Sequence, residues 1–583
     1  MKARIGIILL CATFLSISAA IAFEPEAIDA NPKLVNLTAD WVPATVYNVT
    51  DGVYVAVGYN RDNPALIEGP DGLIVVDPCE STVAAERAKA AFNEHLDDIF
   101  SRKPVKAIVY THYHDCHIHG STVFAGNDSP EIIAHESFED ALFSPTAVYN
   151  QIFPIKAYRY FKYAGVMFQN DPGYFVNGGI FPFSVPGPSG YLPPTLTVGD
   201  MLETNIAGVN MTLFHAPGET TDIIYVWLPD KKALIQIGNF YKSFPAVNTL
   251  RGASFRDPLK YIDSIDRMRK LNAEYLVLIH SGAPIVGAEN VSRTLTNARD
   301  GLQFVHDQTV RYMNMGLTPG EIIKLIELPP HLAEDPYLQE YFGEVDRDVF
   351  QIFEQYLGWF TGEARDIFPM SPREEAEGMA YLAGGFDQLA AKARGALDDG
   401  YMERALIFAD YALILDPANA EARDVKNISM ISLAEETSNA QVYNYLISEY
   451  LEETGQIKIP ILDGGFSSID ENMVVYMPMD SIFRIMAVSL NASKCLDDDY
   501  VVGLELADGN TTIESYSMHV RHGIVEVQPK IADDLAFTIA TDPLTWKNAV
   551  VGKLNPEKAV SSGEIEIIGA EPEEFFGFMD LFK

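Results

Sequence analysis

The chain has 583 residues, which is too long for one hydrophobic core, so we expect two to four domains. Its composition, 48% apolar and 21% charged, is that of an ordinary globular protein. The formal net charge of −39 argues against nucleic acid as a partner and against adhesion to an anionic membrane surface.

Residues 1–22 have the pattern of a secretory signal peptide. Lys2 and Arg4 precede an apolar run, and Ala20-Ile21-Ala22 offers a small-x-small cleavage site before Phe23. A retained membrane anchor is the alternative. No later segment is long and apolar enough to span a bilayer. We therefore expect a periplasmic or secreted protein without a stable membrane anchor.

Three cysteines remain after cleavage, too few for a disulfide scaffold: Cys79, Cys116 and Cys495. A Cys79–Cys116 disulfide is compatible with an oxidising compartment. It would remove Cys116 as a metal ligand, and the sequence leaves the choice open.

The first elements in chain order indicate an α/β fold. Alternating strands are expected over residues 51–59 and 64–70, and a hairpin turn at Asp71-Gly72 leads into a third strand that ends at Asp77. Residues 80–100 have helical spacing, and residues 105–110 are a short run of β-branched and aromatic residues. A strand–helix–strand unit of this kind is typical of α/β proteins.

The loop after that strand carries four histidines within eight residues: His112, His114, His117 and His119. Asp115 and Cys116 lie between them. Imidazole, thiolate and carboxylate are the groups that bind zinc, and a loop leaving a strand end can turn several of them onto one point. A polar loop that happens to be rich in histidine is the alternative.

Residues 140–195 are rich in aromatics and poor in regular period, and their Pro and Gly content predicts long loops. These aromatics form either a local core or an apolar lining beside a metal, which a fatty substrate would need.

Further strand-like runs deliver more polar candidates, each just before a loop that contains Gly or Pro. These are Glu219 in a Pro-Gly-Glu-Thr turn and His280 before Ser281-Gly282. Converging strand ends are a common way for α/β enzymes to assemble a site.

The segment THYHDCHIHG resembles the His-x-His-x-Asp-His signature of the metallo-β-lactamase superfamily, with Cys116 at the aspartate position. Glu219 resembles the ligand of the alkylsulfatase branch, and His280 matches the last ligand of the superfamily. The resemblance implies zinc, as one or two ions, held by two sets of residues: His112, His114 and Glu219 in one, and Cys116, His117 and His280 in the other.

The same resemblance implies roles for two residues that do not bind metal. Asp77 would orient the metal loop through hydrogen bonds, and Arg251 would grip a sulfate group. The sequence departs from the alkylsulfatases at Gly238, where a bridging glutamate is expected, and at Ala246, where an asparagine is expected.

The remainder of the chain resembles the later domains of the alkylsulfatases. Residues 316–455, with the LPPHL and YLGWF stretches, are similar to the all-α dimerisation domain and contain paired amphipathic helices like tetratricopeptide units. A homodimer is expected, and an intramolecular helical pack is the alternative. Residues 456–583 resemble an α+β sterol-carrier-like domain.

The predicted division is a signal peptide (1–22), an αββα metallo-β-lactamase sandwich (23–315), the helical domain (316–455) and the sterol-carrier-like domain (456–583). The leading hypothesis is a metal-dependent hydrolase of alkyl sulfates, acting on a small amphiphilic substrate with metal-activated water. The alternatives are a single-metal hydrolase of another ester or phosphoester, and a secreted lipid-binding protein with a degenerate metal site.

Overall fold

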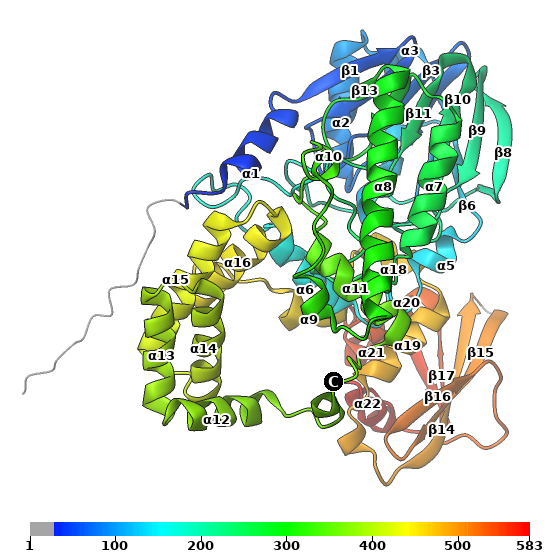
Figure 1. Cartoon of the computed structure of the whole chain (residues 1–583). Helices are drawn as coiled ribbons and strands as arrows, with labels where there is room; N and C mark the ends of the chain where they lie inside the picture. Colours follow the sequence, from blue (N-terminus) through cyan, green and yellow to red (C-terminus); the bar gives the residue numbers. More distant parts are fainter. Residues whose placement is uncertain (1–27, 510) are drawn as a thin grey trace, which may run out of the picture.

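The computed structural model describes residues 28–509 and 511–583, so the predicted signal peptide lies outside the described residues. A double-sheet region, a helical region and a C-terminal α+β region follow one another along the chain (Figure 1). Within the described residues, no helix is both long and apolar enough to cross a bilayer.

Two sheets form the centre of the first region. The strands of the first sheet lie side by side in chain order, β1 to β7, and those of the second are ordered β13-β12-β11-β10-β9-β8. Their bounds are β1 Thr45–Thr50, β2 Val53–Val57, β3 Ala65–Gly69, β4 Gly72–Val76, β5 Val105–Val109, β6 Glu131–His135, β7 Leu196–Val198, β8 Met201–Ile206, β9 Val209–His215, β10 Ile224–Leu228, β11 Ala233–Gln236, β12 Tyr275–Leu278 and β13 Ile285–Val286.

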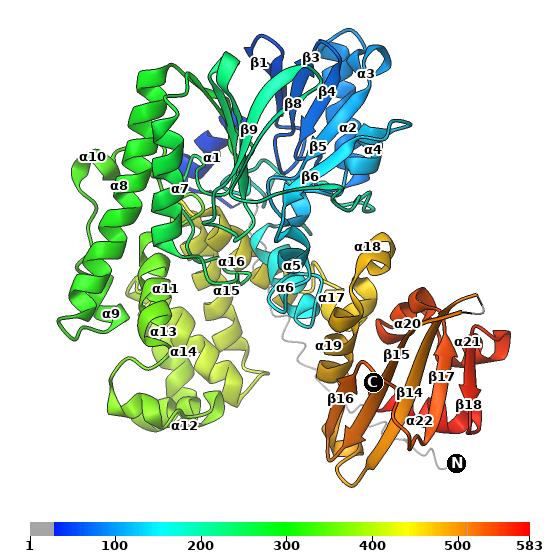
Figure 2. The ribbon, with the colours of Figure 1, turned by 90° about the vertical axis from the view of Figure 1, so that its right-hand side faces the viewer.

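Helices cover the outer face of each sheet, with α2 and α4 on one side and α7 and α8 on the other (Figure 2). The helices of this region are α1 Pro32–Leu37, α2 Thr82–His95, α3 Ile99–Arg102, α4 Ser121–Ala125, α5 Phe138–Leu142, α6 Phe153–Tyr163, α7 Pro258–Lys270 and α8 Ala288–Met313. This arrangement confirms the predicted αββα sandwich.

Strand β4 shows why the layers stack in this way. Its residues are all buried, and they alternate between two cores: Ile74 and Val76 belong to the core between the sheets, whereas Leu73 and Val75 pack under α2. Successive side chains of a strand point to opposite faces, so an uninterrupted apolar run is what a strand covered on both faces requires. The hairpin turn before β4 is formed by Pro70 and Asp71, one residue earlier than predicted.

The segment 140–195 differs from its prediction as a set of long loops, because residues Phe153–Tyr163 form helix α6. Pro154 in the first turn favours a helix start. The expectation of loops was wrong here because aromatic residues on several sides of the helix hide its 3.6-residue period.

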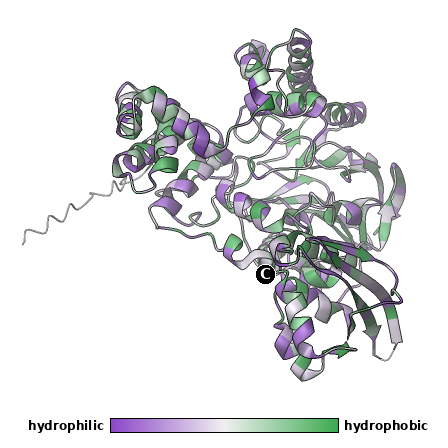
Figure 3. Ribbon diagram, turned by 90° about the horizontal axis from the view of Figure 1, so that it is seen from below, coloured by the Kyte–Doolittle hydropathy of each residue, from purple (hydrophilic) through white to green (hydrophobic). Residues whose placement is uncertain are grey.

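The helical region folds mainly as antiparallel helices joined by short connections (Figure 1). Both hydrophobic and hydrophilic residues occur along these helices, as expected for helices with one buried face (Figure 3). Their bounds are α9 Pro319–Ile322, α10 Pro330–Ala333, α11 Val345–Leu357, α12 Pro372–Ala383, α13 Phe386–Asp398, α14 Met402–Leu415, α15 Ala420–Glu436 and α16 Ala440–Glu453.

The C-terminal region is a five-stranded sheet, ordered β16-β15-β14-β17-β18, with helices packed against it. Its elements are α17 Ile461–Gly464, α18 Glu471–Tyr476, α19 Met479–Ser489, β14 Asp499–Asp508, β15 Thr511–Arg521, β16 Ile524–Gln528, β17 Phe537–Thr541, α20 Pro543–Val550, α21 Pro556–Ser562, β18 Ile565–Ile568 and α22 Pro572–Asp580.

This region docks directly on the first one. Asn472 donates from Nδ2 to the Ser189 carbonyl at 2.9 Å, and Asp470 accepts the Ser189 backbone N–H at 3.3 Å. The rings of Tyr191 and Tyr476 meet edge to face, with centroids 5.1 Å apart. The C-terminal region is therefore in place to contribute to a site in the first region.

Candidate metal and catalytic site

The predicted metal ligands gather in two adjacent clusters of side chains. The ligand atoms of His112, His114 and Glu219 lie within 4.8 Å of one another, and so do those of Cys116, His117 and His280. The ring centroids of His112 and His117 are 4.5 Å apart, which places the clusters side by side. The structure therefore brings together all six predicted ligands.

Strand ends produce this convergence. Residues 112–117 follow β5, Glu219 lies in the turn between β9 and β10, and His280 follows β12. The chain turns sharply at several of these ends, with positive φ at Asp77, Gly238 and Ser281. Sharp turns of this kind change the direction of the chain at the end of a strand. The residues that follow the strand can then point their side chains toward a site at the edge of the sheet.

The donor atoms fit a pair of divalent cations. Nε2 of His112 lies 2.8 Å from Nδ1 of His114, and the Cys116 Sγ lies 2.9 Å from Nε2 of His117, so donor atoms face one another in each cluster. Burial lowers the pKa of His112, His114 and His280 well below the usual value, which keeps these imidazoles neutral as metal ligation requires. Cys79, Cys116 and Cys495 are free thiols, so Cys116 is not consumed by a disulfide.

Asp77 lies behind the second cluster. Its carboxylate accepts hydrogen bonds from the Thr111 backbone N–H at 2.8 Å and the Thr111 hydroxyl at 2.6 Å, and it lies 3.1 Å from Nδ1 of His117. The carboxylate thus faces the Nδ1 side of the ring, while Nε2 faces Cys116 Sγ in the cluster. The geometry therefore suits the orienting role predicted for Asp77.

Asp62 is a second carboxylate at the same imidazole, and sequence analysis missed it. One of its oxygens lies 3.8 Å from Nδ1 of His117. The side chain is fully buried, and within the described residues neither oxygen accepts a hydrogen bond from another side chain. Burial, together with the charges of Asp77 and Glu80, raises the pKa of Asp62 well above its usual value, which favours the neutral carboxylic acid.

Glu219 is held from two sides. Arg256, another residue that sequence analysis missed, donates from Nη2 to Glu219 Oε1 at 3.0 Å. The Glu219 backbone N–H donates to Asn239 Oδ1 at 2.9 Å. Gly238 packs closely against the same side chain, because a Cβ built at this position would lie 2.7 Å from Glu219 Oε2. The glycine that departs from the family pattern thus leaves room for the glutamate that is kept.

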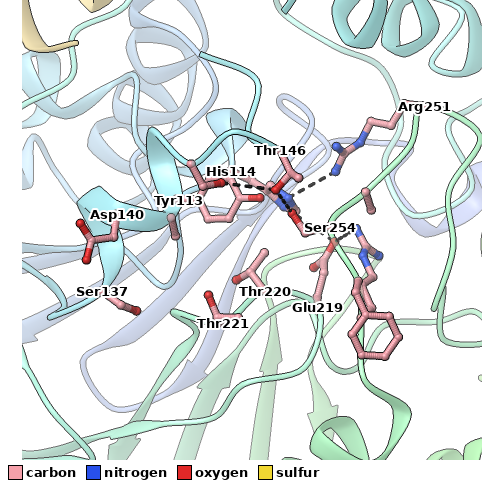
Figure 4. Close-up of a pocket in the computed structure, with 15 residues that line it drawn as sticks. Tyr113, His114, Ser137, Asp140, Thr146, Glu219, Thr220, Thr221, Arg251 and Ser254 are labelled. Atoms are coloured by element: carbon pink, nitrogen blue, oxygen red, sulfur yellow. Dashed lines mark hydrogen bonds and ion pairs between the residues drawn. The ribbon is translucent and has the colours of Figure 1, made fainter. Parts of the chain in front are cut away.

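Arg251 reaches the first cluster. Its Nη2 lies 3.3 Å from Nε2 of His114, and the side chain is buried (Figure 4). The two other polar residues of the histidine loop do not join the clusters. Asp115 pairs with Arg61 at 3.4 Å, and His119 lies between the hydroxyls of Tyr149 and Ser189.

A cavity of about 230 Å³ opens beside Arg251 and His114; we call it the tail cavity. One face of α6 lines it with residues at i, i+3, i+4, i+7 and i+8: Phe153, Lys156, Ala157, Tyr160 and Phe161. Val148, Val166 and Ile461 extend its apolar wall, and Ile461 comes from the C-terminal region.

Arg61 is a further missed residue at the polar end of the tail cavity. Its guanidinium lies over the Tyr160 ring, 4.6 Å from the centroid, and donates to the Tyr160 hydroxyl at 3.0 Å. No local motif identifies it, because the hydrogen-bond partners of its guanidinium, Asp115 and Tyr160, lie 54 and 99 positions away along the chain.

A second cavity, of about 290 Å³, also borders Arg251 and His114; we call it the hydroxyl cavity (Figure 4). Its walls are rich in alcohol side chains: Ser137, Ser144, Thr146, Thr220, Thr221 and Ser254. The metal clusters thus meet two spaces, one with a mainly apolar wall and one whose wall combines alcohol side chains with apolar residues.

Comparison with known proteins places this architecture in a family. The metallo-beta-lactamase superfamily model matches residues 61–280, the alkyl sulfatase dimerisation model residues 318–455, and the alkyl sulfatase C-terminal model residues 467–583. The chain is 31% identical over 532 residues to a linear primary-alkylsulfatase of Pseudomonas sp. (strain ATCC 19151), covering 88% of this chain and 98% of the relative.

More distant relatives agree. An (R)-specific secondary-alkylsulfatase of Pseudomonas sp. is 26% identical over 576 residues, which is 96% of this chain and 84% of the relative. The solved structure of the stereoselective inverting sec-alkylsulfatase Pisa1 from Pseudomonas sp. shares the fold, with a TM-score of 0.84 at 23% identity, over 95% of this chain and 87% of that one. The chain therefore belongs to the alkylsulfatase family of the metallo-beta-lactamase superfamily.

Proposed function

We propose that the protein is a zinc-dependent hydrolase of alkyl sulfate esters, exported from the cell and active as a homodimer. The observation that carries the proposal is the tail cavity, whose apolar walls end at Arg251 and His114 beside the metal clusters. An amphiphilic sulfate ester needs an apolar wall for its alkyl chain and charged groups for its sulfate, no farther apart than the length of the ester itself. The ester, phosphoester and lipid-binding alternatives are not favoured, because the relatives that match most of the chain are alkylsulfatases.

Substrate binding divides between the two ends of the tail cavity. The alkyl chain packs against the face of α6 and Ile461, at about 25 cal/mol for each Å² removed from water. The sulfate lies against Arg251, whose guanidinium presents two parallel N–H donors to a tetrahedral oxyanion. Because Arg251 is buried, that interaction is screened less by water and salt than a surface contact would be.

When bound, divalent cations at the two clusters supply Lewis acidity and activate water near neutral pH. The chain's own residues do the positioning. Arg256 fixes the Glu219 carboxylate, Asp77 fixes the ring of His117, and Arg251 orients the ester. The walls of the tail cavity exclude bulk water from the reacting group, so these charges act in a low dielectric.

Cys116 supports zinc as the metal. A thiolate is a softer ligand than the carboxylate expected at this position, and soft ligands favour zinc over manganese or magnesium. Cys116→Asp should therefore shift the bound metal from zinc toward manganese when both are supplied in excess. Equal zinc retention by the wild type and Cys116→Asp would remove this support.

Turnover is tested by the release of inorganic sulfate from dodecyl sulfate, together with the metal content of the purified protein. We expect zinc and sulfate release in the wild type, and loss of both activity and some metal in His114→Ala. The matched control is His522→Ala, which removes an exposed imidazole in the C-terminal region. Metal-loaded wild-type protein that releases no sulfate would refute the proposal.

A further inference from the structure

The tail cavity and the hydroxyl cavity have two lining residues in common, His114 and Arg251, among the residues that the structure describes. An ester held at Arg251 therefore faces two different spaces at once. One accommodates its alkyl chain, as argued above, and the other has no role in the proposed function so far.

The alcohol side chains of the hydroxyl cavity make it a poorer site for an alkyl chain than the tail cavity. Covering its alcohol groups with hydrocarbon would strip them of water, at a cost of about 1–3 kcal/mol for each group left without a partner. Alcohol groups and a guanidinium instead donate hydrogen bonds, which an oxyanion accepts. The ligand class that fits this space is a small hydrated oxyanion.

We propose that the hydroxyl cavity is the subsite that receives inorganic sulfate and releases it, while the alcohol product leaves through the tail cavity. This inference rests on the proposed function. Hydrolysis converts ROSO₃⁻ and water into ROH and HSO₄⁻, which loses its proton to solvent. The two products are the same whether water attacks carbon or sulfur, and they differ in polarity as the two cavities do.

Contacts on the cavity wall support the assignment. The hydroxyls of Thr146 and Ser254 lie 2.6 Å apart, next to Arg251 in Figure 4. Lys156, which lines the tail cavity, donates from Nζ to the Thr146 carbonyl oxygen. This hydrogen bond fixes the backbone of Thr146 at the wall that separates the two spaces.

Charge along the cavity favours release rather than tight retention. Glu219 at the inner end is paired with Arg256, whereas Asp140 is exposed and forms no ion pair with a cationic side chain among the described residues. In Figure 4 Asp140 lies away from Arg251, on the far side of the cavity. The free carboxylate of Asp140 weakens sulfate binding in the cavity, and the net charge of −39 repels the anion once it has left.

Binding of each product to the zinc-loaded protein tests the inference. Titration calorimetry with sodium sulfate and with 1-decanol is carried out on the wild type, on Ser254→Ala and Thr146→Val in the hydroxyl cavity, and on Phe161→Ala in the tail cavity. Loss of a hydrogen bond to a charged ligand should weaken sulfate binding about tenfold in the first two variants. Their decanol affinity should change less than twofold, and Phe161→Ala should show the reverse pattern.

A charge variant probes the release path separately. Asp140→Asn should tighten sulfate binding about threefold by removing a like charge from the cavity. Asp51→Asn, at an exposed carboxylate on the hairpin before β2, should leave it unchanged.

The inference is overturned if Ser254→Ala and Thr146→Val bind sulfate as the wild type does, or if they lose sulfate and decanol equally. The proposed function fails on a different observation, the absence of sulfate release from dodecyl sulfate. Because product binding does not require turnover, the two failures are distinguishable.

Discussion

Arg256 and Glu219 form a hydrogen-bonded ion pair at 3.0 Å, with 1% of the arginine side chain and 11% of the glutamate side chain exposed. A second guanidinium nitrogen of Arg256 donates to the Ala246 carbonyl oxygen at 2.7 Å. The arginine is thus anchored to one loop and fixes a candidate metal ligand on another. Its role is to position Glu219, which is why its removal should be visible in metal binding and in stability.

Arg256→Met should cost about 3–5 kcal/mol of unfolding free energy, because it leaves the Glu219 carboxylate buried without its counter-ion. The variant should also retain less metal in the His112, His114 and Glu219 cluster. Denaturant unfolding and metal analysis measure the two effects. Arg373→Met is the matched control, since its pair with Glu377 is exposed on both sides and should contribute 1 kcal/mol or less. A stable Arg256→Met protein with full metal content would contradict the positioning role.

Gly238→Ala should displace the same carboxylate from the other side. The added Cβ would lie 2.7 Å from Glu219 Oε2 and 2.8 Å from Ile223 Cδ1, on a backbone with φ of +77°. We expect reduced metal content and a loss of more than about 3 kcal/mol, which exceeds the roughly 1–3 kcal/mol of strain from positive φ alone. For the same reason a glutamate at this position would not restore the family's bridging ligand in this chain.

The control for Gly238→Ala is Gly316→Ala. Gly316 has a φ of +85°, and within the described part of the chain its added Cβ would meet no atom within 4 Å. Both variants impose the backbone strain, and only Gly238→Ala imposes the clash. Equal destabilisation of the two would show that the contact with Glu219 has no effect.

Lys156→Met should stabilise the protein in a pH-dependent way. Burial, together with the charges of Arg251 and Arg256, lowers the pKa of Lys156 to about 7, and Asp115 only partly opposes this shift. Between pH 7 and 10.5 the unfolded chain holds a proton that the folded chain does not, so the lysine penalises folding progressively as the pH falls through that window. Below pH 7 the full penalty remains.

The gain from Lys156→Met should therefore be about 5 kcal/mol at pH 6 and should shrink to less than about 1 kcal/mol by pH 10. Urea unfolding of the variant and the wild type at both pH values measures it. Lys260→Met, at an exposed lysine on α7, should show no such pH dependence. A constant difference between Lys156→Met and the wild type would mean that Lys156 keeps its proton through the whole range.

The sandwich could be predicted from sequence because its signal is local. The run from Gly72 to Val76 alternates between two buried faces, and residues that follow such runs collect at one edge of the sheets. His112, Glu219 and His280 could therefore be assigned to one site before any coordinates existed. The family resemblance added which cluster each ligand joins.

The residues that were missed are defined by distant contacts. Arg61 meets Tyr160 from 99 positions away, and Arg256 reaches Glu219 over 37 positions. The sequence around an arginine in a loop has no periodic pattern. It therefore does not show whether the guanidinium pairs with a buried group or with a carboxylate on the surface. Helix α6 was missed for a related reason, because its pocket-lining face carries Lys156 and Tyr160 among apolar residues instead of a uniform apolar stripe.

The helical region offers the last test, which concerns the proposed homodimer. Large apolar side chains on and near α12 are exposed in the single chain, with Tyr381 85% and Leu382 79% exposed, and Phe368 79% exposed just before the helix. A cluster of such residues is unfavourable in water and typical of a subunit interface. Two chains of net charge −39 repel, so apolar contact must supply the attraction between them.

Leu382→Asp combined with Tyr381→Ser should therefore yield a monomer in analytical ultracentrifugation, and lower ionic strength should weaken the wild-type dimer. Ile513→Asp is the matched control, because Ile513 is an exposed apolar residue on β15 of the C-terminal region. It should leave the oligomeric state unchanged. A double variant that sediments as the wild type does would mean that α12 does not form the interface. A wild type that is already monomeric at micromolar concentration would refute the homodimer itself.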